Sequence, residues 1–509
     1  MLLIYRFVRL FLPILLIIIS FAALLPGCEP KEEIVTRDSS ARLEFSADTL
    51  VFDTVFVQTG TVTKRLWVYN RNRRAVRVEQ IGLKTANSPY TLTVSGATGP
   101  LAQDVEIRGR DSLLLLVKAK LGPGAENTPF LVEDQVQFRT NGNEQQVALV
   151  AYGQNAYFHT AETLACNTVW RNDKPHVIYD FVRVDAGCTL TIEAGARVYV
   201  HAGSGIVIKG RLLVNPDLAP GEELKPDDPR FVRFAGDRLE AAYREIPGQW
   251  RGIQFDATSQ GNVVRYAEIK NAGFGLLVFN PENRQPRPNV LVENSIIKNI
   301  SGASLNFASG SASFDGAGIL SFSGDFTLRN CLLTNCGEFA VRGLQGGNFA
   351  LNFCTIANYT RGFVRPNPSL VFSDVLTLAN GQPGPSVLPT VSILNSIVWG
   401  DKEDEIGFEN VSRYANQITV RNSLLRTSTY REAGTATQPG FGRSDNIFTD
   451  PKFISTPDLP RGNRFDYRLD TLSPASNRPL LAPLLARDLL NKPRAATTPD
   501  LGAYERQNP

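Results

Sequence analysis

Histidine is scarce in this sequence, with three residues in 509, and none of them follows residue 201. The six cysteines include no CxxC pair, and His159, His176 and His201 do not stand near them at the spacing of metal ligands. Structural zinc sites need four such side chains at short, regular spacings. The sequence also has no glycine-rich phosphate loop and no nucleophile elbow. We therefore predict neither a bound metal nor a cofactor.

A strong excess of charge is also missing. The chain has 53 basic and 50 acidic residues, and residues 1–27 contain two arginines and no acid, so the rest is almost neutral. Proteins that bind nucleic acid usually carry a clear excess of lysine and arginine. We expect no nucleic-acid partner.

The N-terminus has the layout of a secretory signal. Arg6 and Arg9 precede an apolar run, LFLPILLIIISFAALL, that is short for a membrane span. The following Leu25-Pro26-Gly27-Cys28 resembles a bacterial lipobox, which implies a signal peptide of residues 1–27 and lipidation of Cys28. A plain transmembrane anchor with an incidental thiol is the alternative.

The segment after Cys28 is polar. Glu29-Pro30-Lys31-Glu32-Glu33 resembles the signal that sends Bacteroidota lipoproteins to the outer face of the outer membrane. This resemblance implies a lipid-anchored protein of the cell outer membrane that faces the exterior, with residues 28–41 as a tether. A solvated tether without a sorting signal is the plainer interpretation.

Residues 42–155 alternate between apolar and polar positions, as in RLEFSADTLVFDTVFVQTG and EQQVALVAYG. Short alternating runs separated by Gly, Asn and Pro predict antiparallel strands. About seven strands in this length suit an immunoglobulin-like sandwich. The segment resembles bacterial sandwich domains related to the ASH family. We expect Trp67 in the core of this domain.

A second pattern begins near Gly187 and predicts a right-handed, single-stranded parallel β-helix over residues 156–479. One phrase recurs as NSIIKN, NCLLTN, FCTIAN, NSIVWG and NSLLRT, with the two nearest copies 23 residues apart. A period in the low twenties with short strands is typical of stacked β-coils. The fold class is therefore all-β.

Aligning the repeats places small polar residues in columns. Asparagines fill one turn column, at Asn271, Asn299, Asn335 and Asn358. Small residues fill another, at Ser295, Cys331, Cys354, Ser396 and Ser423. Cys331 and Cys354 are interpreted as packing residues, with a disulfide as the alternative. Cys166 and Cys188 are 22 residues apart, and a disulfide between them would tie down the first coil.

Residues 168–280 resemble the β-helix lipoproteins of Bacteroidota, whose function is mostly unassigned; this resemblance implies that Trp250 packs near the first full turns. The motifs TDPKF, DYRLDTLSPASN and DLGAYE resemble the C-terminal closure of the choice-of-anchor Q family. We expect residues 480–509 to form a cap. The leucines of LLAPLLARDLL predict an amphipathic helix or lid over the last coil.

A third column holds Glu338 and Arg361, with Glu403 nearby after a loop. We interpret it as a row of turn residues with an ion pair between coils, or as a polar strip that holds a ligand. Trp399, the one tryptophan of the repeats, is expected to pack rather than to stack on a sugar. DKEDE (401–405) is expected to be a solvated loop, with weak calcium binding as the alternative.

Residues 290–400 contain only five acids, at Glu293, Asp315, Asp325, Glu338 and Asp374, and they do not align in one column. Glycoside hydrolases need two opposed carboxylates, and polysaccharide lyases need a base and a cation. The favoured function is therefore non-catalytic: the membrane-bound β-helix presents a surface to a polysaccharide or a surface protein. The alternatives are a carbohydrate-active enzyme and a purely structural envelope protein.

Overall fold

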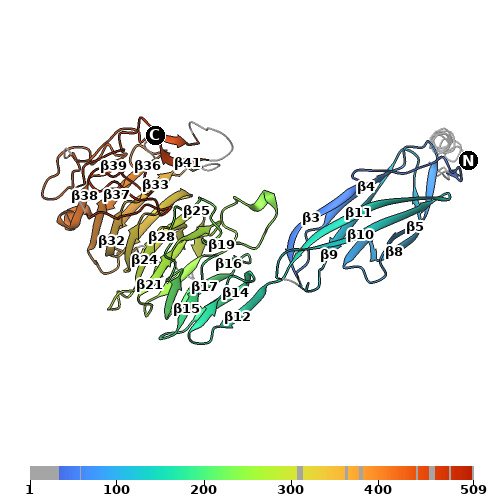
Figure 1. Ribbon diagram of the computed structural model, residues 1–509, viewed down its shortest axis with the longest axis horizontal. Coiled ribbons are helices and arrows are strands. Elements are labelled where there is room, and N and C mark those ends of the chain that lie inside the picture. The colour runs from blue at the N-terminus through green and yellow to red at the C-terminus, as the bar shows by residue number, and fades with distance from the viewer. Residues whose placement is uncertain are drawn as a thin grey trace, which may run out of the picture. The chain divides into compact units, whose positions relative to one another are not determined.

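The computed structural model describes residues 34–57, 59–125, 127–306, 313–360, 365–377, 382–442, 445–457, 465–480 and 483–506 (Figure 1). Cys28, Arg361 and the predicted signal segment lie outside the described residues. The chain divides into two units. The first comprises the described parts of 1–52, 58–122 and 131–152, and the second comprises those of 53–57, 123–130 and 153–509.

The first unit is a sandwich of two β-sheets, as the alternating pattern predicts. Inward residues such as Leu66, Val78, Leu115 and Val147 are fully buried between the sheets. The first sheet contains β1 (Val35–Thr36), β5 (Ala75–Leu83), β10 (Phe130–Thr140), β11 (Asn143–Gln154), β3 (Thr49–Phe56) and β8 (Leu101–Ile107). The second contains β2 (Glu44–Phe45), β4 (Lys64–Tyr69), β9 (Ser112–Ala119), β6 (Tyr90–Val94) and β7 (Ala97–Gly99).

Trp67 does not lie in the core of the sandwich, so that prediction was wrong. It is 40% exposed on the outward side of β4, between the fully buried Leu66 and Val68. Side chains alternate between the two sides of a strand, and the pattern KRLWVY is apolar on both sides. Leu66 and Val68 fill the core, which leaves Trp67 on the surface.

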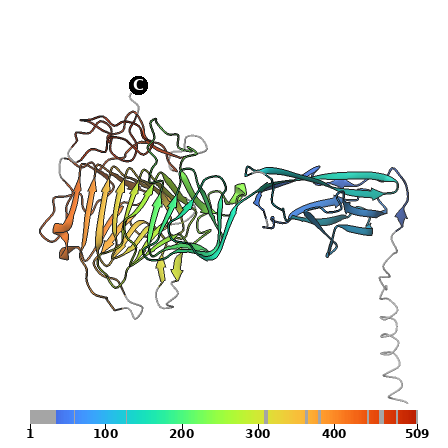
Figure 2. The same cartoon turned by 60° about the horizontal axis from the view of Figure 1, so that its bottom comes forward.

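The second unit is built from three ladders of short parallel strands (Figure 2). The first ladder contains β13 (Thr168–Trp170), β15 (Thr189–Ile192), β18 (Arg211–Val214), β21 (Asn262–Arg265), β24 (Asn289–Glu293), β29 (Asp325–Arg329), β32 (Gly347–Asn352), β35 (Pro389–Leu394) and β38 (Ile418–Arg421). Each strand of this ladder pairs in register with its equivalent in the next coil.

The other two ladders belong to one bent sheet that begins with β12 (Tyr157–Thr163). The second ladder contains β14 (His176–Val184), β16 (Arg197–Val200), β19 (Val232–Gly236), β22 (Ala267–Lys270), β25 (Ile296–Ile300), β30 (Leu332–Cys336), β33 (Thr355–Asn358), β36 (Ile397–Gly400) and β39 (Leu424–Leu425). The third contains β17 (Gly205–Ile208), β20 (Ile253–Asp256), β23 (Leu276–Phe279), β28 (Ala317–Phe322), β31 (Phe339–Leu344), β34 (Leu370–Ser373) and β37 (Ile406–Glu409).

The remaining elements lie outside the three ladders. They are the hairpin β26 (Ser304–Asn306) and β27 (Ser313–Asp315), the pair β40 (Phe453–Ser455) and β41 (Asp466–Leu469), and the 3₁₀ turns η1 (Ala241–Tyr243), η2 (Val411–Arg413) and η3 (Ala415–Gln417). The fold class predicted from the sequence, an immunoglobulin-like sandwich followed by a right-handed parallel β-helix, is confirmed. Within the described residues, no helix is long and apolar enough to cross a membrane.

Inward side chains from all three ladders form one hydrophobic core. At the corner between the first and second ladders, the asparagine of the repeat phrase has a defined structural role. Asn294, Asn330, Asn395 and Asn422 take left-handed conformations with φ between 47° and 50°. Asparagine tolerates this conformation better than most residues because its side chain hydrogen-bonds locally. The next residue of each phrase is small and stacks between coils: the backbone N–H of Cys354 donates to Ser396 Oγ at 3.0 Å.

The cysteines behave as two groups. Cys166 and Cys188 form a disulfide with their Cα atoms 4.6 Å apart. Cys331 and Cys354 are free and fully buried in the small-residue column. Their thiols therefore pack where serine stands in the other coils.

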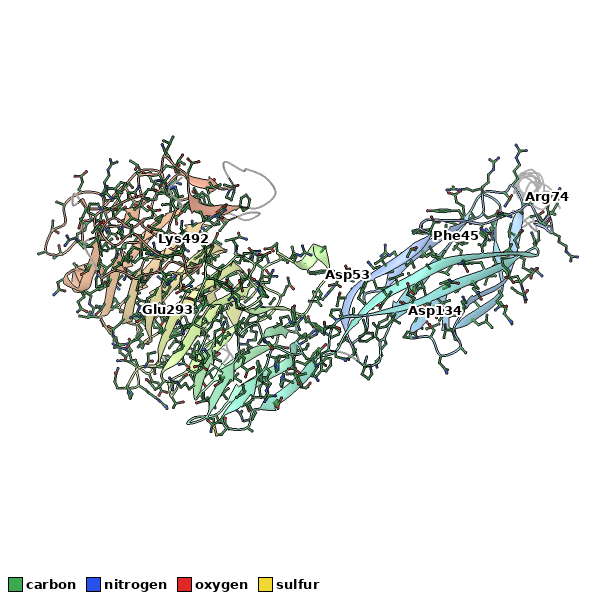
Figure 3. All side chains as sticks on the ribbon, viewed as in Figure 1. Phe45, Asp53, Arg74, Asp134, Glu293 and Lys492 are labelled. Atoms are coloured by element: carbon green, nitrogen blue, oxygen red, sulfur yellow. A yellow bond between two sulfur atoms is a disulfide. The ribbon has the colours of Figure 1, made fainter. Side chains whose placement is uncertain are left out.

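Residues 483–490 contain no helix, and the segment does not lie over the last coil, so both expectations were wrong. The segment runs back along the corner between the first two ladders, towards earlier coils. Asn352 donates to the Pro483 carbonyl at 3.2 Å, Asn330 to that of Arg487 at 2.8 Å, and Asn294 to that of Asp488 at 2.6 Å. We call residues 483–506 the C-terminal strap; Figure 3 labels its Lys492.

Candidate functional site

The predicted turn column lies at the corner between the second and third ladders. Glu338 follows β30, and Glu403 follows β36 at the same corner. Glu338 is 7% exposed and Glu403 is exposed. The ion pair expected between Glu338 and Arg361 cannot be followed, because Arg361 lies outside the described residues.

The cation that organises this corner is Arg365, which the sequence did not single out. Its side chain is fully buried, and its guanidinium contacts Asp401 Oδ1 at 2.6 Å and Glu405 Oε1 at 2.8 Å. Glu405 is also fully buried and accepts hydrogen bonds from Ser369 Oγ at 2.5 Å and Lys402 N at 2.9 Å. This buried network binds the loop before β34 to the loop after β36.

DKEDE is therefore not simply a solvated loop, and that expectation was wrong. Asp401 and Glu405 bind Arg365, and Asp404 binds the loop that follows β39. Thr427 Oγ1 donates to Asp404 Oδ1 at 2.6 Å, and the backbone N–H groups of Ser428 and Thr429 donate at 2.8 and 3.0 Å. Glu403, the fourth acid of this segment, is exposed.

Replacing Asp404 with asparagine should make the free energy of unfolding depend less on pH in the acid range. Burial would raise the pKa of Asp404, but the hydrogen bonds from Thr427, Ser428 and Thr429 outweigh it and lower the pKa to about 2. The folded state binds this proton less readily than the unfolded chain, where the pKa is about 3.9. The carboxylate therefore stabilises the fold above about pH 4, and this contribution is lost as pH falls towards about 2.

Urea unfolding of the wild type and Asp404→Asn at several pH values measures this effect. The difference in free energy of unfolding between the wild type and Asp404→Asn should be largest near neutral pH and should become smaller at acid pH. The matched control is Glu403→Gln, at the exposed neighbouring position, for which we expect little difference at any pH. An equal loss in Glu403→Gln would contradict the assignment to Asp404.

Glu338 lies at the same corner but forms no direct ion pair with Arg365 among the described residues. Its Oε1 accepts a hydrogen bond from Asn367 Nδ2. Burial raises the pKa of Glu338, and the charge of Asp315 raises it further. A single acid of this kind can donate a proton, but hydrolysis of a glycosidic bond also needs a second carboxylate at a defined separation. The acids at Asp401 and Glu405 do not supply it, because they are bound to Arg365.

Trp399 is a packing residue rather than an exposed platform. It is half-buried on the outward side of β36, against a cluster that includes Tyr467, Leu469 and Leu501 from the C-terminal region. The Arg426 guanidinium lies 5.3 Å from the ring centroid. Trp399 therefore offers no free aromatic face of the kind that binds sugars.

The three histidines gather in the first coils and bind one another or acids. His159 Nδ1 lies 2.6 Å from Glu162 Oε2, and its Nε2 lies 3.0 Å from His176 Nδ1, with Trp170 stacked on both rings. Burial lowers the pKa of His176 to about 4. His201 contacts Asp237 at 2.7 Å. Among the described residues, no group of three or more His, Cys, Asp or Glu could hold a metal ion.

The outward sides of the second and third ladders are covered in part. On the second ladder, Ile296, Leu332, Ile397 and Leu424 are at most 8% exposed, beneath Leu489, Leu501 and other C-terminal residues. On the third ladder, Leu277 and Leu320 are fully buried in a cluster with Phe339 and Leu376. These covered parts are hydrophobic cores of their own rather than ligand surfaces.

The outward side of the first ladder is uncovered, and we call it the open face. Every residue of its central row is half-buried or exposed. In register from coil to coil, the row consists of Val169, Thr191, Leu213, Val263, Leu291, Thr327, Ala350, Ser392 and Thr419.

Two polar rows flank the central one. On one side lie Asn289, Asp325, Asn348 and Thr390. On the other lie Arg265, Glu293, Arg329, Asn352, Leu394 and Arg421; Figure 3 labels Glu293. Glu293 pairs with Arg265 at 3.0 Å and with Arg329 at 3.8 Å. Neighbouring strands are about 4.8 Å apart, so the face repeats its hydrogen-bonding groups along the coil stack.

No protein-family model matches this chain, and no curated protein matches it. Similar solved structures cover about a quarter of the chain. The ASH/PapD-like domain 7 of human CEP192 is 11% identical, with a TM-score of 0.16, over 23% of this chain and 85% of that chain. The chaperone DraB of E. coli is 14% identical, with a TM-score of 0.17, over 24% of this chain and 56% of that chain.

A third structure, a family 123 glycoside hydrolase from Clostridium perfringens, is 7% identical with a TM-score of 0.17, over 23% of this chain and 30% of that chain. The chain thus spans less than two thirds of the second and third of these proteins. At these identities and TM-scores, the similarities carry no argument about a ligand or an activity.

Proposed function

We propose that this chain is a Bacteroidota lipoprotein, anchored through Cys28 at the outer face of the outer membrane, whose β-helix binds a ligand without catalysis. The ligand is a glycan or another protein outside the cell. The N-terminal lipobox-like motif and the charged segment after it support the anchor. The choice-of-anchor Q-like motifs near the C-terminus support the family.

The observation that carries the binding role is the open face. Its central row is uncovered in every coil, whereas the other two outward sides are covered in part, and it offers repeated hydroxyl, amide and guanidinium groups beside aliphatic ones. A repeating surface of this kind suits a ligand that is itself extended and repetitive. A polysaccharide is therefore the ligand class to test first.

We would test a panel of polysaccharides against the mature chain, starting at residue 28 with Cys28→Ser. We expect binding without new chain ends. Leu291→Arg with Thr327→Arg, at the centre of the open face, should weaken binding by about tenfold or more because the long side chains prevent close approach. Appearance of new chain ends or of an unsaturated uronide would contradict the non-catalytic proposal.

The matched control places the same substitution on the other unit. Thr91→Arg with Leu131→Arg alters two exposed positions of the sandwich and adds the same charge. Binding should be unchanged in this variant. Equal losses in both variants would show that added charge, rather than the open face, controls binding.

A further inference from the structure

The sandwich has one end that is rich in arginine. The loop between β4 and β5 contributes Arg73 and Arg74, and the loop between β8 and β9 contributes Arg108 and Arg110. All four side chains are exposed, and within the described part of the chain none of them forms an ion pair. We call these four residues the arginine end.

Backbone hydrogen bonds hold the two loops together. The backbone N–H of Arg110 donates to the Asn72 carbonyl at 2.9 Å. The side chain of the fully buried Asn70 donates to the carbonyls of Arg74, Ile107 and Arg108 at 2.9 to 3.0 Å. Four positive charges are therefore fixed at one end by the fold, although mutual repulsion would otherwise separate them.

The described acidic side chains at this end are few, and each forms an ion pair or a hydrogen bond. Arg71 pairs with Glu44 at 3.1 Å. Asp111 accepts a hydrogen bond from the Ser112 backbone, and Asp38 accepts one from Ser40. Residues 29–33 add three glutamates and one lysine, so the positive charge of this end is concentrated on the four arginines and is not a net excess of the whole end.

The described chain begins at this same end. β1 pairs in parallel with β5, so that Val35 lies opposite Ala75, the residue that follows Arg74; Figure 3 labels Arg74. Only five residues separate Cys28 from Ile34, and the six extended steps between these two residues span at most about 20 Å. A lipid on Cys28 would therefore keep the arginine end within about 20 Å of the membrane surface.

We propose that the arginine end binds the anionic headgroups of the membrane that carries the lipid anchor, and so orients the sandwich on that surface. This inference rests on the anchor in the proposed function. Guanidinium groups form paired hydrogen bonds with phosphate oxygens. Attraction between a membrane and basic side chains acts within about one Debye length, which the short tether allows.

The test uses the mature chain with Cys28→Ser, so that no lipid contributes to binding. We would measure sedimentation with vesicles of phosphatidylglycerol and phosphatidylcholine in equal parts, and with vesicles of phosphatidylcholine alone. We expect binding only to the anionic vesicles. Replacing the four arginines with glutamine should weaken it by at least about tenfold, since each basic residue contributes roughly fivefold.

The control removes four positive charges from exposed positions at the opposite end of the sandwich, namely Arg65, Lys84, Lys118 and Lys120, also by glutamine. Binding should persist in this variant. Three results would each overturn the proposal. They are loss of binding in the control variant, absence of binding of the wild type to anionic vesicles, and displacement from the vesicles by inorganic phosphate. Thermal unfolding of both variants verifies that they remain folded.

A separate measurement isolates the anchor. The mass of the N-terminal peptide of the full chain, after expression in a Gram-negative host, shows whether Cys28 carries acyl chains. An unmodified Cys28 would overturn the anchor and, with it, the reason for membrane contact. A modified Cys28 with no vesicle binding would overturn only the role of the arginine end.

Discussion

Replacing Arg365 with methionine is expected to destabilise the β-helix by about 3–5 kcal/mol, because it leaves buried carboxylates without a counter-charge. Arg365 and Glu405 are both fully buried, and Asp401 binds the same guanidinium. Burial would lower the pKa of Arg365, but the charges of Glu405 and Asp401 outweigh it and raise the pKa. The guanidinium is therefore charged in the folded protein at every pH at which the protein is folded.

Denaturant unfolding, followed by far-ultraviolet circular dichroism, measures this loss. The matched control is Arg284→Met in the same unit, which breaks the exposed pair with Glu282. Exposed pairs contribute about 0–1 kcal/mol, so the control should remain close to the wild type. A similarly small decrease in the free energy of unfolding for Arg365→Met would show that water or a local rearrangement solvates Glu405. The corner would then not be rigid.

Replacing Arg494 with methionine is expected to release the C-terminal strap and cost about 3 kcal/mol or more. The Arg494 guanidinium is fully buried and pairs with Glu505 at 3.3 Å. It also donates to Asn330 Oδ1 at 2.9 Å and to the Gly502 carbonyl at 2.8 Å, and it lies 4.2 Å from the Phe353 ring. Methionine can fill most of the space but can make none of the hydrogen bonds.

Hydrogen exchange is the most direct measurement for this variant. Protection should fall in the strap and in β25, β30 and β36, whose outward apolar residues the C-terminal region covers. The control is Arg487→Met on the same strap, where the side chain is exposed and donates to the Asn491 carbonyl at 2.8 Å. Unchanged protection in Arg494→Met would mean that apolar contacts alone hold the strap.

The repeat phrase was enough to predict the coil architecture. The register of the structure joins Asn299 to Asn335 through hydrogen-bonded side chains at 2.8 Å, as the alignment of the repeats requires. It also places Ser295, Cys331 and Cys354 in one buried column. Stacked coils bring equivalent residues together, so periodicity in the sequence translates directly into contacts.

The residues whose positions were not predicted correctly lie in parts of the chain that do not follow the repeat, or in a strand whose alternation does not identify the buried side. Arg365 and Glu405 are 40 residues apart in loops of unequal length, and charge alone does not show that they meet. The strap has the leucine spacing of a helix, but its carbonyl groups accept hydrogen bonds from asparagines of several coils. Trp67 lies in a strand that has large apolar residues on both sides. The alternating pattern therefore does not show which side faces the core.

The sequence by itself determined the all-β class, the order of sandwich and β-helix, and the residues that stack from coil to coil, because these follow from local alternation and repetition. Only the tertiary structure decided which outward side stays open, where the C-terminal strap lies, and which charges are buried together. Those features depend on loops and segments that return across many coils. Their positions are set by the burial of apolar surface and by the pairing of buried charges, which no short stretch of sequence contains.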